Sequence, residues 1–492
     1  MEGKPSSSSS TPRWKPHPGM HAPGQLRSAL TFVTAAWGFG AVWMYITTGA
    51  ALTQYAKSMN MSKFGFGLLA ALPFAGLLVQ VYASYLIERY GNRKKLFIIA
   101  GTAHRAMWLL IAAIPWLPAG IAPPAQQWIY LLLFMAVSTF LANLNGPAWL
   151  VWMADLVPER IRGRYFARRG QLGRFVGVVT TLAIGFTLDR ASGGDSLFFQ
   201  RVISIGFIIA AICGMVDIIA FRWVPDYPPR AVNHGMSFGS MISRTFKNKT
   251  FVRFVAFNAT MTFAIAYVGQ FAWLFLLEEV FVGDDWANVK ANMMLVLIPI
   301  IVTMATFGIW GRLVDRLGCR PVLLIAGVMV THGALAWVFV TKDDWWLGMI
   351  AAMSATAAWP GIELASQNLI LGVSGSDQNQ AGGSAFVAVH SFFIGIAGVA
   401  SGIFGGLVAQ TLRDYRGEFL GYPLTYHGLL FAISAGIRIA SLVWLIGMHE
   451  PESYTARAAL RYMATNIYSN MQQAMFASVR GLGRLRKKTL RF

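Results

Sequence analysis

The sequence predicts an all-α polytopic membrane protein in which twelve transmembrane helices form two pseudo-symmetric six-helix bundles. Three observations lead to this prediction. Hydrophobic residues make up 55% of the chain and charged residues only 13%, whereas soluble domains carry about 25% charged residues. Twelve apolar segments are long enough to cross a bilayer, which takes about 20 residues. A short charged motif also occurs twice, with its copies almost half the chain apart.

The apolar segments begin after residues 1–27, which are rich in Ser and Pro and show no apolar period. We expect these residues to form a disordered cytoplasmic tail. The first six spans make an N-terminal bundle over residues 28–225, and the last six a C-terminal bundle over residues 251–450. In chain order the predicted spans are Ser28–Ala56, Phe64–Ile87, Leu96–Leu117, Trp128–Ala154, Phe166–Leu188, Phe199–Arg222, Phe251–Leu277, Trp286–Trp310, Val322–Val340, Trp345–Val373, Gly382–Leu412 and Leu424–Met448.

The connections between these spans carry most of their positive charge on one side. The formal net charge is +20, and the even-numbered connections hold most of the loop arginines and lysines. Because cytoplasmic loops retain Lys and Arg, we expect both termini in the cytoplasm. As the location we expect the cytoplasmic (inner) membrane of a bacterium. The same bias explains the positive charge without a nucleic-acid partner.

Two pairs of landmarks indicate that the bundles are a parallel repeat. Gly311 lies 227 residues after Ser84, the first residues of the two motif copies. Pro225 and Pro451, which follow the sixth and twelfth spans, lie 226 residues apart. A Pro-, Gly- and Arg-containing stretch, 226–250, separates the halves and is predicted to be a cytoplasmic linker. Parallel halves that enclose a site near the bilayer midplane are typical of transporters.

The C-terminal segment 451–492 combines apolar residues at helical spacing with a basic end. We expect an amphipathic cytoplasmic helix that lies on the membrane and binds anionic lipids. The alternative is a solvated tail. The apolar positions are Leu460, Met463, Ile467, Met471, Met475 and Val479, and the basic ones are Arg484, Arg486, Lys487, Lys488 and Arg491.

The repeated motif resembles the loop signature of the major facilitator superfamily. The second copy reads Gly311-x-Leu313-x-Asp315-Arg316-x-Gly318-x-Arg320, and the first has Ser84 and Glu88 at the Gly and Asp positions. The copies fall between the second and third and between the eighth and ninth spans, where the family carries them. The resemblance covers about residues 28–450 and implies that family's fold and alternating-access transport.

The resemblance also implies a cytoplasmic gate built from the motif. A helix-end carboxylate can accept hydrogen bonds from the free N–H groups at a helix start, and arginine can clamp a carboxylate. Glu88 would then meet the helix start at residues 382–383, and Asp315 the start near Gly163 and Arg164. Arg93 would pair with Asp155, whose counterpart in the second half is the neutral Asn368. The alternative is that these charges only set topology. The predicted gate residues are Glu88, Arg89, Gly91, Arg93, Asp155, Arg162, Gly311, Asp315, Arg316, Gly318 and Arg320.

Polar side chains inside the first, fourth, seventh and tenth spans are the candidate binding residues. Polar groups are costly in a membrane, and by the resemblance these four helices line the central cavity. Glu363 lies near the middle of its span, where a buried carboxylate could bind and release a proton as access alternates. The alternative is a structural Glu. The candidates are Trp37, Tyr45, Asn143, Asn145, Trp149, Asn258, Gln270, Glu363, Gln367 and Asn368.

Two further features are expected to be structural. His104 and Arg105 interrupt the third span, and because the resemblance makes this helix peripheral, we expect Arg105 to pair with Asp217 of the sixth span. Glycines in the fifth and eleventh spans give small faces, which by the resemblance should meet each other across the two halves.

Signals for enzymatic chemistry are missing from the sequence. It contains no Walker-type phosphate loop, no Cys or His cluster with metal-ligand spacing and no nucleophile elbow, and its two cysteines cannot form a disulfide framework. We therefore expect no enzyme, cofactor or metal.

The predicted function is secondary active transport of a small organic solute, coupled to protons, by a monomer in the lipid bilayer. One alternative is a non-transporting protein on the same fold, such as an assembly factor, sensor or scaffold. Another is an exporter of a hydrophobic or porphyrin-like compound. A transporter needs polar groups that converge on a hydrated space, whereas a scaffold would fill that space with aromatic side chains.

Overall fold

The computed structural model describes residues 23–90, 92–226, 245–375 and 383–448, together with residues 243, 450, 454, 457, 458 and 461. The predicted N-terminal tail, most of the linker and the amphipathic C-terminal segment lie outside the described residues. Gly91 lies outside them as well, and the side chains of Glu88 and Arg89 are not described.

The N-terminal half is a bundle of long helices. They are α1 (Pro23–Ile46), α2 (Gly49–Ser58), α3 (Lys63–Tyr90), α4 (Arg93–Ala113), α5 (Gln127–Leu156), α6 (Glu159–Ala191) and α7 (Ser196–Ala220), with short turns η1 (Ile114–Trp116), η2 (Pro124–Gln126) and η3 (Phe221–Trp223).

The first predicted span, Ser28–Ala56, is not one helix. It breaks between α1 and α2, where Gly49 has a φ of 65° that a side chain would strain. The hydroxyl groups of Thr47 and Thr48 donate back to the carbonyls of Trp43 and Met44 and close the last turn of α1.

The C-terminal half repeats the bundle and adds a small hairpin. Its elements are α9 (Lys249–Ala266), α10 (Gly269–Phe275), η4 (Leu276–Val280), α11 (Ala287–Asn292), η5 (Met293–Leu297), α12 (Ile298–Leu317), α13 (Cys319–Ala336), η6 (Trp337–Phe339), α14 (Trp345–Gly375), α15 (Gly383–Thr411), β1 (Arg416–Phe419), β2 (Tyr422–Thr425) and α16 (Tyr426–Ile446). Strands β1 and β2 pair antiparallel, with Arg416 opposite Thr425 and Phe419 opposite Tyr422.

The predicted all-α membrane fold is confirmed. Among the described residues, 11 helical segments are long and apolar enough to cross a membrane, and they follow the predicted order. The remaining predicted span corresponds to α14, which has 31 residues. Its hydropathy is lowered by Pro360, by Glu363 and by the amide side chains of Gln367 and Asn368. Three of the candidate binding residues, Glu363, Gln367 and Asn368, thus lie in this span.

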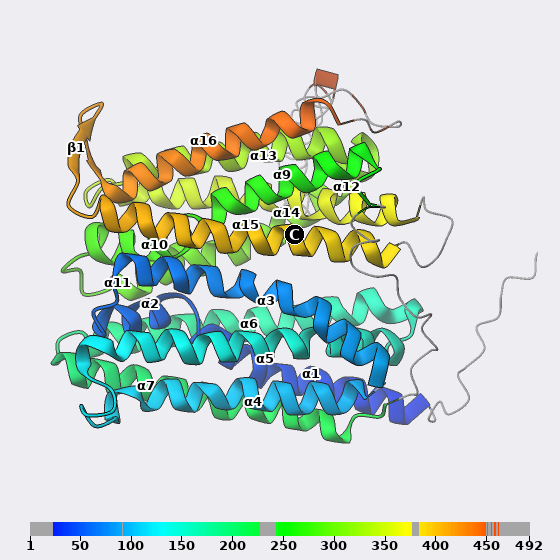
Figure 1. The fold of residues 1–492 in the computed structure, drawn as a ribbon, viewed down its shortest axis with the longest axis horizontal. Coiled ribbons are helices and arrows are strands. Elements are labelled where there is room, and N and C mark those ends of the chain that lie inside the picture. The colour runs from blue at the N-terminus through cyan, green and yellow to red at the C-terminus, as the bar shows by residue number, and fades with distance from the viewer. Residues whose placement is uncertain are drawn as a thin grey trace, which may run out of the picture.

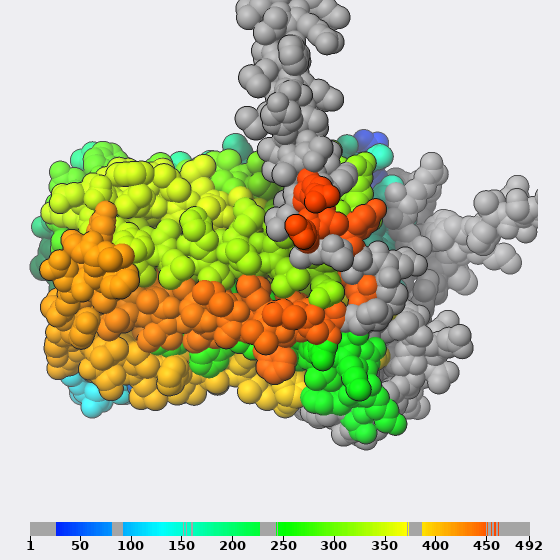
Figure 2. Space-filling model, turned by 90° about the horizontal axis from the view of Figure 1, so that it is seen from above, coloured from blue at the N-terminus to red at the C-terminus, as the bar shows by residue number. Residues whose placement is uncertain are grey.

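The two bundles lie side by side, and their helices run along the long axis of the molecule (Figure 1). We call the end with the β hairpin the hairpin end, and the end with Arg93, Asp155 and Gly318 the motif end. At the interface α3 packs against α15, and the two helices diverge toward the motif end in Figure 1. Seen from above, one face consists mainly of the C-terminal half, with α16 running along it and the hairpin at one edge (Figure 2).

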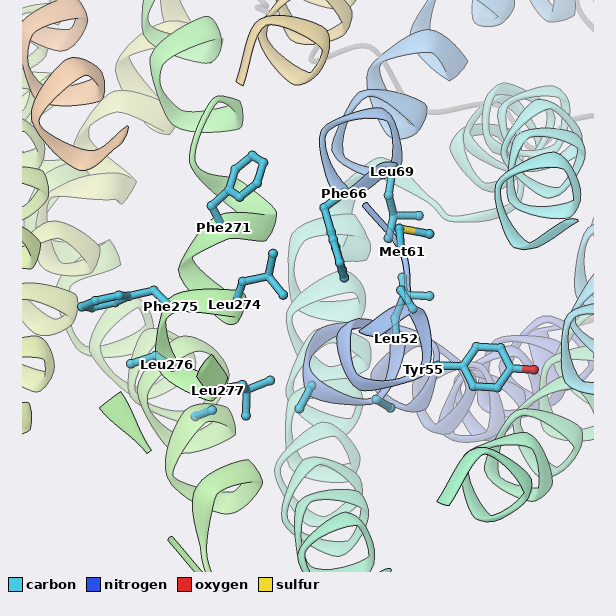
Figure 3. Packing of buried hydrophobic residues seen from close by; sticks show 14 of the residues in the cluster. Leu52, Tyr55, Met61, Phe66, Leu69, Phe271, Leu274, Phe275, Leu276 and Leu277 are labelled. Carbon is cyan, nitrogen blue, oxygen red and sulfur yellow. The ribbon is translucent and has the colours of Figure 1, made fainter. Parts of the chain in front are cut away.

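The apolar core joins the halves at the hairpin end. One cluster contains Tyr55 and Phe66 from the N-terminal half and Phe271, Leu274 and Leu277 from the other. Leu274 points toward Phe66 across the interface (Figure 3). Two other clusters, one around Trp152 and one around Trp310, each draw their buried residues from one half. Hydrophobic burial therefore closes the hairpin end while each half keeps a core of its own.

Glycines set the closest approach of the halves. A Cβ on Gly67 of α3 would lie 2.3 Å from the carbonyl oxygen of Gly402 and 2.4 Å from the Cα of Gly406, both on α15. The expectation that the fifth and eleventh spans meet is wrong, because the eleventh span, α15, packs on α3. Two glycines of the fifth span, Gly173 and Gly177 of α6, instead contact Trp37 and Tyr45 of α1.

We predict that Gly67→Ala lowers the apparent melting temperature of the detergent-purified protein. The new methyl group would press on backbone atoms that cannot rotate away, which costs about 1–3 kcal/mol. Gly436→Ala is the matched control, since a Cβ there meets nothing within 4 Å. Equal melting temperatures for the two variants, measured by tryptophan fluorescence, would contradict the close contact.

Candidate functional site

A carboxylate from one half holds a helix start of the other at the hairpin end. Asp189, near the C-terminus of α6, accepts hydrogen bonds from the backbone N–H groups of Asn288 and Val289 at 2.8 and 3.0 Å. It also accepts one from the side-chain amide of Asn288 at 2.8 Å. These groups open α11, so their N–H groups have no partner within the helix. Asp189 thus supplies three acceptor contacts across the interface.

Further polar contacts reinforce this junction. Lys63 at the start of α3 forms a 2.6 Å ion pair with Glu278 of η4. The amide of Gln54 donates to Asn288 at 2.9 Å, and that of Asn292 donates to the carbonyl of Thr181 at 3.3 Å. We call Lys63, Asp189, Glu278 and Asn288 the hairpin-end latch. Sequence reasoning missed it because no repeated motif marks these residues.

At the motif end, Arg93 ties the N-terminal half together. Its side chain is 0% exposed, and it forms ion pairs with Asp155 at the end of α5 and with Asp226, the latter at 3.0 Å. The predicted contact with Asp155 is formed, whereas Asp226 was not anticipated. Lys94 adds hydrogen bonds to the carbonyls of Val224 at 2.6 Å and Arg222 at 3.0 Å. The start of α4 is therefore bound to the ends of α5 and α7.

Arg320 occupies the equivalent position in the C-terminal half but has different partners. Its guanidinium donates to the carbonyls of Leu445 and Ile446 at the end of α16, at 3.0 and 2.7 Å. The carboxylate of Glu450 accepts from the backbone N–H groups of Cys319 and Arg320 at 3.0 and 2.8 Å. Gly318 turns the chain with a φ of 88°, as its place in the motif requires.

The predicted contact of Asp315 with Gly163 and Arg164 is not formed in this conformation. All three residues are exposed, and no described hydrogen bond or ion pair joins them. Gly311 is partly buried against Leu364, Arg316 is exposed, and Arg162 donates to the carbonyl of Val157 at 3.4 Å.

The correspondence of Asn368 with Asp155 stays a prediction, because no described contact joins Asn368 to the motif residues of its half. Asp155 lies one residue before the end of α5, whereas Asn368 lies seven residues before the end of α14 at Gly375. Seven helical residues span about 10 Å, so α14 continues further beyond Asn368 than α5 does beyond Asp155. Its side chain is exposed on α14.

Three predicted binding residues do meet, at a cavity inside the N-terminal half. This cavity of about 370 Å³ is formed by α1, α4, α5, α6, α7 and the start of η3. Its lining residues are Trp37, Trp43, Phe97, His104, Arg105, Ala142, Asn145, Gly146, Trp149, Arg169, Asp217, Ile218 and Phe221. The predicted residues among them are Trp37, Asn145 and Trp149.

The other two candidates of this half lie elsewhere. Tyr45 packs against Gly177 of α6. Asn143 faces α3, where it accepts a 3.0 Å hydrogen bond from the amide of Gln80. Asn143 and Asn145 are two residues apart and project from different faces of α5, so both cannot enter one cavity.

The candidates of the C-terminal half do not line the same cavity. Asn258 is buried in α9 and accepts from the hydroxyl of Ser366 at 3.3 Å. Gln270 lies toward the hairpin end, where the hydroxyl of Thr53 donates to it at 3.5 Å. On α14, the amide of Gln367 donates to partly buried Glu363 at 3.4 Å. Gln367 itself is exposed, so this part of α14 is not enclosed.

Arg105 and Asp217 were expected to pair on the periphery, and they pair instead at the wall of the cavity. Arg105 Nη2 lies 4.0 Å from Asp217 Oδ2. The guanidinium carbon of Arg105 lies 3.3 Å from the ring centroid of Trp43, so the two groups stack. The guanidinium of Arg169 lies between two indoles, with its carbon 4.2 Å from the ring centroid of Trp37 and 4.8 Å from that of Trp149. Arg169 was not a candidate, because a loop-proximal arginine is easily attributed to membrane topology.

Comparisons with known proteins agree with this architecture. The model of the Major Facilitator Superfamily matches residues 29–399. A relative from Bacillus subtilis (strain 168), the uncharacterized MFS-type transporter YxiO, is 21% identical over 327 residues, which cover 63% of this chain and 71% of the relative.

Solved transporter structures share the fold. The nucleoside transporter NupG superposes with a TM-score of 0.61 at 13% identity, covering 85% of this chain and 98% of NupG. A D-xylose-proton symporter gives 0.62 at 14% identity, with 87% and 98% covered. A bacterial homolog of the human lysosomal transporter Spinster, solved inward-facing and occupied, gives 0.59 at 15% identity, with 87% and 96% covered.

We predict that Arg93→Gln lowers stability by about 3 kcal/mol, because it leaves two carboxylates without their shared cation. The apparent melting temperature in detergent measures the effect. Lys95→Gln, at an exposed position two residues away, should change it little. A loss no larger than that of the control would show that the Arg93 ion pairs contribute nothing to stability.

Proposed function

The chain belongs to the major facilitator superfamily, and we propose that it is a secondary active transporter that moves a small organic solute by alternating access. The observation that carries the proposal is the asymmetry of the interface between the halves. The hairpin-end latch and the shared apolar cluster join the halves at one end. Toward the other end α3 and α15 diverge (Figure 1). Transporters built from two bundles alternate between such one-sided states.

We propose that the motif end faces the cytoplasm of a bacterium, with both termini on that side. The arginine-rich connections lie at this end, and Lys and Arg are enriched on the cytoplasmic side. In this orientation the structure represents an inward-facing state. The exposed Gln367 and Asn368 of α14 then face the aqueous opening, since exposure to lipid would be costly for an amide.

We propose that switching exchanges one latch for another of the same kind. Asp189 holds a helix start of the opposite half at the hairpin end. Asp315, which is exposed, can do the same at the motif end with the start of α6, which begins at Glu159. Each latch places a carboxylate on unsatisfied N–H groups, so the two contacts have similar strength and neither state is locked.

Proton coupling is the finer part of the proposal, and Glu363 is its candidate. Its carboxylate is partly buried on the exposed part of α14, where water can deliver a proton, and its described partner is the neutral amide of Gln367. The scaffold alternative is less favoured, because a scaffold would fill the space between the halves with packed side chains, whereas Gln367 and Asn368 of α14 are exposed.

We predict that Asp189→Asn shifts the protein toward the state that is closed at the motif end. The lost charge-assisted hydrogen bonds are worth about 1.5–3 kcal/mol. Since a tenfold change in an equilibrium corresponds to about 1.4 kcal/mol, the hairpin-end-closed population should fall at least tenfold relative to the other state.

Spin-label distances measure this shift in a background without Cys213 and Cys319. One pair, Ala125→Cys with Val282→Cys, reports on the hairpin end, and a second, Arg164→Cys with Arg312→Cys, reports on the motif end; all four positions are exposed. Asp343→Asn, an exposed carboxylate of the same end, is the control. Unchanged distances in Asp189→Asn would refute the latch.

We also predict that Glu363→Gln abolishes solute-driven proton uptake into proteoliposomes while solute exchange persists. Metabolite pools are first screened for ligands that raise the melting temperature, since a ligand that binds the folded state stabilises it. Glu418→Gln, in the hairpin, is the control. Normal proton uptake by Glu363→Gln would exclude Glu363 from coupling.

A further inference from the structure

The cavity inside the N-terminal half has the size and access of a ligand site. Its volume of about 370 Å³ falls within the range of small-molecule pockets, about 300–1,000 Å³. Gly146 on its lining is exposed, while Trp149 and Arg169 beside it are partly buried. A ligand can therefore enter past Gly146 and lie within one bundle.

The charges on the cavity wall do not balance. Its described lining residues include two guanidiniums, Arg105 and Arg169, and one carboxylate, Asp217. His104 adds no charge, because its Nε2 lies 3.2 Å from Nη1 of Arg105, which can only donate. Nε2 is therefore the acceptor, and the proton sits on Nδ1, 2.8 Å from the hydroxyl of Ser138. The cavity is left with one excess positive charge.

Several hydrogen-bonding groups around the cavity also have no protein partner among the described residues. Arg169 makes no described hydrogen bond, and Nε of both Arg105 and Arg169 is buried without an acceptor. Trp43 Nε1 and Asp217 Oδ1 are likewise unpartnered. Buried polar groups are almost always satisfied in folded proteins. Guanidiniums stacked on indole faces keep their edges free to bind an acceptor in the cavity.

The backbone is shaped to hold these charged groups in place. A Cβ on Gly40 of α1 would lie 2.3 Å from Asp217 Oδ2, and one on Gly214 of α7 would lie 2.7 Å from Cδ of Arg105. A Cβ on Gly173 of α6 would lie 2.3 Å from Nε1 of Trp37, the ring under Arg169. The glycines of α1, α7 and α6 thus leave room for the side chains of Asp217, Arg105 and Trp37.

We propose that this cavity binds an organic monocarboxylate with a flat apolar body. The carboxylate accepts from the guanidinium edge of Arg169, in the fork geometry that suits this group, and from Nε of Arg105. The apolar body lies against Trp37, Trp149 and Phe221. Asp217 compensates one guanidinium, so a single negative charge neutralises the site and a dianion overcompensates it. The identification of this ligand as cargo rests on the proposed transport function.

Binding to the purified full chain in detergent tests the proposal without requiring transport. The probes are benzoate, benzamide and benzamidine, which are flat and of similar size but carry negative, zero and positive charge, together with inorganic phosphate. At millimolar concentrations, benzoate should raise the apparent melting temperature and the other three should not. No shift with benzoate, an equal shift with benzamide, or an equal shift with phosphate would each overturn the proposal.

Variants locate the binding. Arg169→Gln should weaken benzoate binding at least tenfold, Arg169→Lys should weaken it less, and Arg174→Gln, at an exposed position of the same helix, should leave it unchanged. Gly146→Leu keeps every charge and places its side chain in open space at the mouth, so it should fold and also weaken binding at least tenfold. Full benzoate affinity in both Arg169→Gln and Gly146→Leu would place the ligand elsewhere.

The two proposals fail separately. Benzoate binding that depends on Arg169, without benzoate flux into proteoliposomes, would sustain the site and contradict its use in transport. Unresponsive Asp189→Asn spin-label distances would contradict the gating proposal while leaving the binding result intact. Transport of another solute by a protein that does not bind benzoate would overturn the monocarboxylate site alone.

Discussion

The contact between Asp189 and the start of α11 joins two bundles that are otherwise complete. Each half buries an apolar core of its own, so those cores alone would let the halves separate. At the hairpin end the carboxylate of Asp189 satisfies N–H groups that α11 cannot satisfy itself. The ion pair of Lys63 with Glu278 and the apolar cluster around Phe66 complete the junction. Because these contacts lie at one end, the opposite end is free to open.

The motif end follows the opposite arrangement, in which charges bind within a half. Arg93 is fully buried between Asp155 and Asp226, and Arg320 caps the carbonyls at the end of α16. Each of these arginines joins helices of its own half and does not link the two halves. The carboxylate of Asp315, by contrast, is exposed and available to the opposite half. Rigid halves with a replaceable contact at each end are what a rocking mechanism needs.

The cavity in the N-terminal half shows where sequence reasoning about polar residues falls short. The sequence predicts that the intramembrane residues Arg105 and Asp217 form a pair. It does not indicate that their helices border a cavity. Arg169 lies directly after an arginine-rich connection, so the bias of positive charge toward the cytoplasm is enough to explain it. Only packing reveals that it lies over Trp37 and Trp149 and that its Nε has no acceptor among the described residues. Conversely, Glu363 is prominent in the sequence as a carboxylate within a span, yet α14 presents it beside exposed amides and outside this cavity.

The membrane class, the order of the spans, the parallel repeat and the pairing of Arg93 with Asp155 could all be predicted from the amino-acid sequence. Apolar length, charge bias and motif spacing are local properties, set by neighbours along the chain. What depends on relative placement required the folded structure. In the folded structure the first span breaks at Gly49, and α15 packs against α3 rather than α6. Folding also brings Asp189 and Asn288 into contact, although 99 residues separate them along the chain.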